Sequence, residues 1–259
     1  MAKPAIRAIK IGKCYQKSAK KPERELLGVA ALRAVQSPFR AISRTTEDEV
    51  IWSLRNVSFE VQKGESIAFV GSNGSGKSTL LKILSRITEP TEGSAEVRGK
   101  LGSLLELGTG FHPELTGREN IYLSASTLGI SRRQMVSMFD QIVEFSEVEH
   151  LLETPVKYYS SGEYVRLGFA VAAHVEREIL LIDEILAVGD VAFQAKCMKK
   201  MGSLRNEGRT LVFVTHESSY VEQLCQKTLW LDKGSVMEWG DTDKVLPRYL
   251  DFMAAAGTV

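Results

Sequence analysis

The fold class is decided by the stretch Ile67-Ala68-Phe69-Val70-Gly71-Ser72-Asn73-Gly74-Ser75-Gly76-Lys77-Ser78. Its apolar start predicts a short buried strand, and the residues after Lys77 have helical spacing. Between them lies the pattern G-x-x-x-x-G-K-[S/T], whose glycines let successive backbone N–H groups converge on a phosphate because no Cβ obstructs them. The positive end of the following helix strengthens this attraction. The stretch therefore predicts a phosphate-binding loop between a strand and a helix.

The side chains of this loop suit a nucleotide with its metal ion. We expect Lys77 to reach the β- and γ-phosphates and Ser78 to ligate Mg²⁺. The predicted ATP-binding residues are Gly71, Ser72, Asn73, Gly74, Ser75, Gly76, Lys77, Ser78 and Thr79. A plain glycine-rich turn is the alternative, and the combination of strand, loop, Lys and Ser argues against it.

A second apolar run, residues 179–182, ends in Asp183 and Glu184. Asp183 would hold the Mg²⁺, and Glu184 would polarise the attacking water as general base. Two acids after a strand are also common in solvated turns, but the phosphate loop makes that alternative less favourable. Since no site for a phosphate acceptor is evident, the residues predict nucleotide hydrolysis.

Further strands are expected to alternate with helices, which is typical of an α/β fold. The other predicted strands lie near residues 6–11, 54–61, 97, 211–214 and 229–236. We interpret residues 54–70 as a hairpin that ends in the buried strand. Thr116 with Glu119, and Ser131 with Gln134, have capping-box spacing and predict helix starts.

These signals together predict one domain over residues 1–259, with a P-loop NTPase core and a parallel sheet. An N-terminal antiparallel β subdomain and a helical subdomain over about residues 107–178 complete it. An inserted amphipathic helix is expected within residues 17–45.

Composition and charge limit the class of protein. The 259 residues are 44% hydrophobic and 25% charged, which is an ordinary globular composition. No apolar run approaches the roughly 18 residues needed to cross a bilayer, and the start lacks a secretory signal. Residues 1–45 contain eleven Lys or Arg and two Glu, although the whole chain has a net charge of +1. Without aromatic interleaving, this basic arm favours a membrane surface or solvent, so no nucleic-acid partner is expected.

Three further features identify a family. The stretch Tyr159-Ser160-Ser161-Gly162-Glu163-Tyr164-Val165-Arg166-Leu167 resembles the L-S-G-G-Q signature of ATP-binding cassette (ABC) proteins. His216, after a predicted strand, resembles their switch histidine, and Asp190 resembles their D-loop aspartate. The motifs occur in the family's order, so nearly the whole chain resembles an ABC transporter ATPase subunit.

Three stretches are similar to the polysaccharide-exporter branch, which moves O-antigen, capsule or teichoic acid chains. They are residues 106–120 (ELGTGFHPELTGREN), 159–162 (YSSG) and 183–190 (DEILAVGD). The long insertion after Tyr15 also resembles that branch. The resemblance implies export of a lipid-linked polysaccharide through a separate permease.

The resemblance also implies a head-to-tail homodimer with two ATP molecules at its interface. Ser160, Ser161, Gly162 and Glu163 would bind the ATP held by the other copy's phosphate loop. Both Glu184 and His216 would be catalytic. The dimer would drive an integral membrane permease, expected in two copies, from the cytoplasmic face of the inner membrane. The permease would make most contacts with the polysaccharide.

The sequence departs from the family pattern at several positions. Ser161 and Glu163 replace a glycine and the glutamine of the signature. Glu106 stands where the family has its Q-loop glutamine and is a candidate Mg²⁺ ligand. For adenine stacking the family uses an aromatic ring after the first strand. Tyr15 is the matching candidate, with Trp52 and Phe39 as rivals.

Two other functions fit part of the evidence. A non-transport ABC ATPase would share the motifs, but such proteins usually carry long coiled coils or a second cassette. A small-molecule or nucleotide kinase would leave the signature and His216 unexplained.

About twenty residues follow Gly240, too few for the carbohydrate-binding domain that some exporters append. Permease contacts are expected at Phe111, His112 and Leu115.

Overall fold

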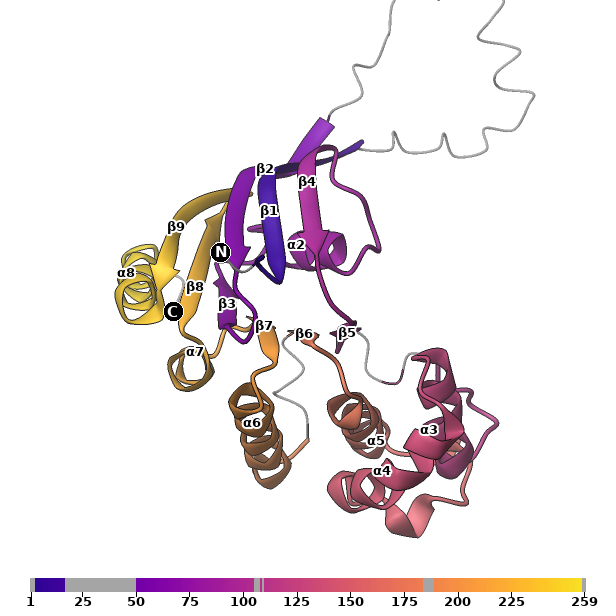
Figure 1. Ribbon diagram of the computed structural model, residues 1–259. Coiled ribbons are helices and arrows are strands. Elements are labelled where there is room, and N and C mark those ends of the chain that lie inside the picture. The colour runs from indigo at the N-terminus through magenta and orange to yellow at the C-terminus, as the bar shows by residue number, and fades with distance from the viewer. Residues whose placement is uncertain (1–2, 17–49, 105–107, 109, 184–188, 258–259) are drawn as a thin grey trace, which may run out of the picture.

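The computed structural model describes residues 3–16, 50–104, 108, 110–183 and 189–257 (Figure 1). The predicted insert over residues 17–45 lies outside these ranges. Within the described ranges, none of the helices combines the length and apolar character that a bilayer crossing requires.

The smaller of two sheets is antiparallel and has the strand order β2-β1-β4. Its strands are β1 (Ile6–Gln16), β2 (Val50–Val61) and β4 (Glu92–Val97). Apolar and polar residues partly alternate along β1 and β2, so that one face of each is buried and the other reaches solvent. The antiparallel N-terminal strands predicted from the sequence are confirmed.

The larger sheet has the order β5-β6-β7-β3-β8-β9 and is parallel except for β9. Its strands are β3 (Ser66–Val70), β5 (Leu101–Ser103), β6 (Ile179–Ile182), β7 (Thr210–Val214), β8 (Lys227–Asp232) and β9 (Ser235–Asp241). All residues of β3, β6 and β7 are buried, as central parallel strands require. Ile67 and Phe69 pack into one apolar core, and Ala68 and Val70 pack into a second. The α/β class with a parallel sheet is confirmed.

The predicted hairpin of residues 54–70 is wrong. β2 pairs with β1 in the small sheet, whereas β3 pairs with β7 and β8 in the large one. β3 is buried along its whole length and needs covered neighbours on both sides. β2 has one exposed face and suits the partly solvated small sheet. The turn at Gly64 therefore connects two sheets.

α2 (Lys77–Leu84) lies on the side of the large sheet that faces the small sheet, and the other helices lie on its opposite side (Figure 1). Those helices are α3 (Gly117–Thr127), α4 (Arg132–Ser146), α5 (Ser161–His174), α6 (Val191–Asn206), α7 (Ser218–Leu224) and α8 (Thr242–Ala255), with 3₁₀ turns at Glu149–Leu151 and Val156–Tyr158. α2 packs into the core shared by the two sheets. α3, α4 and α5 contact one another and lie within the range predicted for a helical subdomain, and α5 also contacts α6. Both predicted capping boxes are confirmed at the starts of α3 and α4.

Candidate nucleotide-binding site

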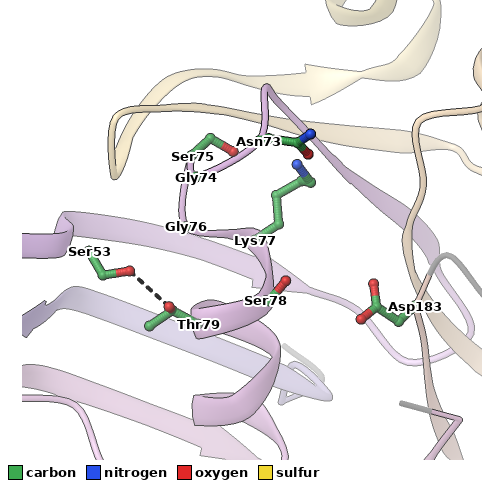
Figure 2. Close-up of a pocket in the computed structure, with 9 residues that line it drawn as sticks. All are labelled: Ser53, Asn73, Gly74, Ser75, Gly76, Lys77, Ser78, Thr79 and Asp183. Atoms are coloured by element: carbon green, nitrogen blue, oxygen red, sulfur yellow. Dashed lines mark hydrogen bonds between the residues drawn. The ribbon is translucent and has the colours of Figure 1, made fainter. Parts of the chain in front are cut away.

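The phosphate loop occupies the junction that the sequence predicted. It follows β3 and ends where α2 begins at Lys77. Gly76 stands at the N-cap with φ +106° and provides no side-chain cap, so backbone N–H groups at the start of α2 have no side-chain acceptor there. The loop opens on a cavity of about 280 Å³ (Figure 2). The cavity is lined by Ser53, Asn73, Gly74, Ser75, Gly76, Lys77, Ser78, Thr79 and Asp183. This arrangement suits a bound anion.

Two glycines of the loop have no room for a side chain. A Cβ at Gly71 would lie 2.2 Å from the carbonyl oxygen of Leu231. A Cβ at Gly76 would lie 2.6 Å from Leu54 Cδ2 and 2.7 Å from the Ser53 carbonyl oxygen. The loop is therefore shaped by close backbone approach to β2 and β8.

A distant turn also supports the loop. The N–H of Gly234, between β8 and β9, donates to the carbonyl of Ser75 at 3.0 Å, and its own carbonyl accepts from the N–H of Arg55 at 2.8 Å. The hydroxyls of Ser53 and Thr79 are 2.8 Å apart, which joins β2 to the first turn of α2. The loop and the helix start that follows it are thus held from both sheets.

The ammonium group of Lys77 lies within the loop. Its Nζ donates to the carbonyls of Gly71 at 2.7 Å and Ser72 at 3.0 Å, and the residue is only 6% exposed. Figure 2 shows the side chain extending along the inside of the loop toward Asn73. A positive charge held in this way is positioned for the phosphates of a nucleotide.

Ser78 and Asp183 provide oxygen atoms on two sides of the cavity. Ser78 lies in the first turn of α2, and Asp183 directly follows β6. Figure 2 shows the hydroxyl and the carboxylate facing each other across the opening. Such hard oxygen donors fit Mg²⁺, which is usually bound by few protein groups together with phosphate oxygens. The other predicted acidic residues, Glu184 and Glu106, lie outside the described residues.

His216 follows the strand that lies between those of the phosphate loop and Asp183. β7 pairs in parallel with both β3 and β6, so the ends of all three strands lie at one edge of the sheet. The Thr215 hydroxyl accepts from the N–H of Glu217 at 3.0 Å and shapes this turn. His216 is exposed and is not among the residues that line the cavity in the described part of the chain.

Tyr15 lies near the end of β1, opposite Ile51 of β2. Its ring is 44% exposed, and the ammonium of Lys13 lies 5.3 Å from the ring centroid. The rival Trp52 is less exposed and lies beneath the guanidinium of Arg55, at 5.0 Å. Neither ring lines the cavity, although neighbouring Ser53 does. Phe39 lies outside the described residues.

The signature forms the start of α5. Ser160 is the N-cap, and its Oγ accepts from the N–H of Glu163 at 3.3 Å. The Glu163 carboxylate accepts in return from the N–H of Ser160 at 2.7 Å. Hydrogen bonds from the Ser160 hydroxyl and backbone N–H to this carboxylate lower the pKa of Glu163 from its ordinary value. The serine and the carboxylate therefore form a third capping box.

A cavity of about 450 Å³ lies at this helix start. It is lined by Glu147, Val148, His150, Ser160, Gly162, Glu163, Arg166, Gly189 and Asp190. Arg166 donates to Glu147 Oε2 at 2.7 Å and to Asp190 Oδ2 at 2.8 Å. Asp190 also caps α6 by accepting from the N–H of Phe193 at 2.9 Å. That hydrogen bond, followed by the charge of Arg166, lowers the pKa of Asp190.

The two cavities share no residue. The structure brings Ser78, Lys77 and Asp183 together in one, and Ser160, Gly162 and Asp190 together in the other. Within one chain, the signature therefore does not contribute to the phosphate cavity.

Comparison with known families agrees with this geometry. A model of the ABC transporter family matches residues 54–187, slightly more than half of the chain. The chain belongs to the ABC transporter family. As an ABC ATPase it binds and hydrolyses ATP.

Several curated relatives of this ABC ATPase carry export names. It is 45% identical over 202 residues to the O-antigen export system ATP-binding protein RfbB of Klebsiella pneumoniae, covering 78% of this chain and 82% of the relative. It is 39% identical over 210 residues to the teichoic acids export ATP-binding protein TagH of Bacillus anthracis, covering 81% of this chain and 38% of the relative.

Solved structures share the fold of this ABC ATPase. A dimeric ATP-binding cassette in a post-hydrolysis state, bound to ADP and Pi, aligns with a TM-score of 0.70 at 21% identity. The alignment covers 92% of this chain and 98% of that chain.

The sequence motifs of this ABC ATPase did not identify several residues that line the two cavities. Ser53 lines the phosphate cavity from β2, and no local motif marks it. Glu147 and His150 line the signature cavity, and no local motif marks either of them. The S-x-x-E spacing of Ser160 and Glu163 is a capping-box signal that could have been recognised.

Proposed function

We propose that this ABC ATPase powers the export of a lipid-linked polysaccharide through a separate membrane permease. The phosphate cavity and the signature cavity are separate, and each holds only part of the predicted reaction centre. This separation is the observation that supports the proposed mode of action. The choice of polysaccharide rests on the O-antigen and teichoic acid export names of its relatives.

A head-to-tail homodimer would complete both cavities. In such a dimer Ser160 and Gly162 of one copy would face the γ-phosphate held by the other copy's loop. The exposed start of α5 suits this role, since a helix N-terminus attracts an anion. Asp190 would lie at the same interface, because Arg166 holds it beside the signature.

Within the phosphate cavity each side chain has a proposed task. Lys77 would neutralise phosphate charge, and Ser78 and Asp183 would hold the Mg²⁺ that neutralises the rest. Glu184 would orient and activate the attacking water, with His216 near the γ-phosphate. Glu106 is proposed as a further Mg²⁺ ligand and Tyr15 as the ring that stacks on adenine.

The permease is proposed to dock in a groove between β5 and the end of α2 on one side and the helices α3 and α5 on the other. This docking groove has a volume of about 350 Å³ and a mostly apolar lining. It is lined by Ser85, Ile87, Leu101, Gly102, Ser103, Gly108, Ser124, Thr127, Leu128, Gly168 and Ala172. The predicted contacts Phe111, His112 and Leu115 follow Gly108 along the same loop. The ATPase would then sit on the cytoplasmic face of the inner membrane as a peripheral subunit.

Three experiments test this proposal. Purification in detergent should recover a polytopic membrane protein with the chain, and its repeated absence would favour the alternative of a non-transport ABC ATPase. A Glu184→Gln variant should retain ATP binding and accumulate as a dimer in size-exclusion chromatography. A strictly monomeric and fully active Glu184→Gln variant would contradict the proposed reaction centre.

For Glu106→Ala, an unchanged Mg²⁺ dependence with unchanged transport coupling would remove Glu106 as a ligand.

A further inference from the structure

Tyr164 joins the signature helix to a loop 56 residues earlier in the chain. Its hydroxyl donates to the carbonyl of Gly108 at 3.0 Å. Its ring packs edge-on against Phe111, with the ring centroids 5.3 Å apart at 71°. The same Gly108 carbonyl accepts from the N–H of Phe111 at 2.8 Å, a hydrogen bond that closes a turn. The Tyr164 hydroxyl therefore binds the carbonyl group on which this turn closes.

The contact is close on the loop side as well. Gly108 has φ +75°, and a Cβ there would lie 2.4 Å from Tyr164 Cε1. Farther along the loop, the buried side chain of Asn120 donates to the carbonyls of His112, Leu115 and Thr116. The loop is therefore fixed to α5 at its beginning and to α3 at its end.

Tyr164 also stands between the docking groove and the signature. Its N–H donates to the carbonyl of Ser160 at 3.0 Å, in the first turn of α5. Residues 160, 164, 168 and 172 recur every four positions and so follow one side of the helix. Gly168 and Ala172 line the docking groove, and Gly108 lines it from the loop.

We propose that Tyr164 is a positioning residue that transmits a displacement of the Gly108 turn to the signature serine. The proposal rests on the proposed function, since the displacement would come from a permease in the docking groove. An occupant that shifts Gly108 would shift the hydroxyl and ring of Tyr164, and with them the first turn of α5. ATP hydrolysis would thereby respond to the permease.

The experiment compares Tyr164→Phe, which loses only the hydroxyl bond, with Tyr164→Leu, which also loses the aromatic contact. Tyr122→Leu is the matched control, because the Tyr122 ring of α3 stacks on Phe139 of α4 with the ring centroids 5.5 Å apart. ATP turnover and KM are measured for each chain alone and in complex with the co-purified permease. We expect Tyr164→Leu to lower the stimulation by the permease about fivefold, with KM unchanged. Tyr164→Phe should have a smaller effect in the same direction, and Tyr122→Leu should keep the wild-type stimulation.

Gly108→Ala tests the same contact from the other side. Gly110→Ala is its control, since Gly110 has φ +89° but a Cβ there would meet only Thr127 Oγ1, at 3.9 Å. Both changes strain the backbone, and only Gly108→Ala forces the turn against Tyr164. It should therefore reduce stimulation more than Gly110→Ala does. Adding Tyr164→Leu to Gly108→Ala should cause little further loss, because both act on one contact.

Coupling is reciprocal, so the link can also be tested without a permease. In the ATP-loaded Glu184→Gln dimer, the backbone amides of residues 110–112, 114 and 115 should exchange more slowly with deuterium than in the ATP-free chain. This protection should be lost with Tyr164→Leu. Equal protection in both proteins, or an unchanged stimulation by the permease, would overturn the proposal. A dimer that protects the loop but recovers no permease would instead refute the export function and leave the role of Tyr164 intact.

Discussion

The helices α2 and α5 begin in opposite ways. α2 starts at Gly76 in a left-handed conformation without a side-chain cap. α5 starts at Ser160 with a complete capping box formed by Glu163. Both starts line a cavity, so the difference lies in what satisfies their N–H groups.

This contrast assigns different tasks to the two ends of the proposed ATP site. The start of α2 can take a phosphate without giving up a side-chain hydrogen bond. At α5, a phosphate would compete with a carboxylate that is already bound to the backbone. We therefore expect ATP to bind first at α2 and the contact with α5 to be the weaker, more adjustable step.

The largest effect should come from Lys77→Ala. This change removes the positive charge inside the phosphate loop, so ATP hydrolysis should fall by at least about a hundredfold. Phosphate release measures the effect. Lys82→Ala, at an exposed position in the last turn of α2, is the control and should remain active. Comparable activity in both variants would mean that the start of α2 does not hold the phosphates.

A second test concerns the shape of the α2 start. Gly74→Ala places a Cβ in open space at φ +79° and should cost about 1–2 kcal/mol. Gly76→Ala adds the clash with Leu54 and Ser53, so its cost should be larger by roughly 1–3 kcal/mol. Urea unfolding compares the two. Equal losses would show that the backbone can relax at Gly76.

The capping boxes allow a matched test at α5. Ser160→Ala and Ser131→Ala each remove an N-cap and should each cost about 1 kcal/mol in the free energy of unfolding. In the proposed dimer, ATP turnover should fall only with Ser160→Ala, because Ser131 lies at the start of α4, away from both cavities. If turnover falls equally in both variants, the loss comes from stability and Ser160 has no role toward ATP.

The smallest effect is expected from Glu163→Gln. Glutamine retains an acceptor for the Ser160 N–H and removes a negative charge, so the ATP-dependent dimer should form at about threefold lower ATP concentration. Glu119→Gln in the matching box of α3 is the control. Size-exclusion titrations at pH 6 and pH 8 measure the effect.

The expected effect of pH follows from the lowered pKa of Glu163. The hydrogen bonds from Ser160 stabilise the charged carboxylate. Their contribution to the stability of the fold is therefore present above the unfolded-state pKa of 4.5, and it is lost as pH falls through the lower folded-state pKa. The gain from Glu163→Gln should thus be the same at pH 6 and pH 8. A gain that disappears at pH 6 would point to another titrating group.

Features encoded within a few residues were predictable from the sequence. The phosphate loop and two capping boxes need only local spacing, and the structure contains all three. The loop motif and the acidic pair after a second apolar run predicted Ser78 and Asp183 at one Mg²⁺ site, and both residues line one cavity.

Long-range pairing was not predictable in this way. β2 and β3 are neighbours in sequence, yet they join different sheets because β3 needs two buried partners from the later chain. The contact of Tyr164 with Gly108 depends on how a loop returns to α5. The spacing of apolar and polar residues within either segment does not indicate such a contact.

The hydrogen bond from Gly234 to Ser75 has a consequence for biosynthesis. The ribosome makes the phosphate loop early, but the backbone group that closes it emerges about 160 residues later. We therefore expect nascent chains that stop before Gly234 to lack a finished loop and to bind nucleotide poorly. Nucleotide binding would then distinguish a polypeptide that includes Gly234 from an abandoned fragment that lacks it.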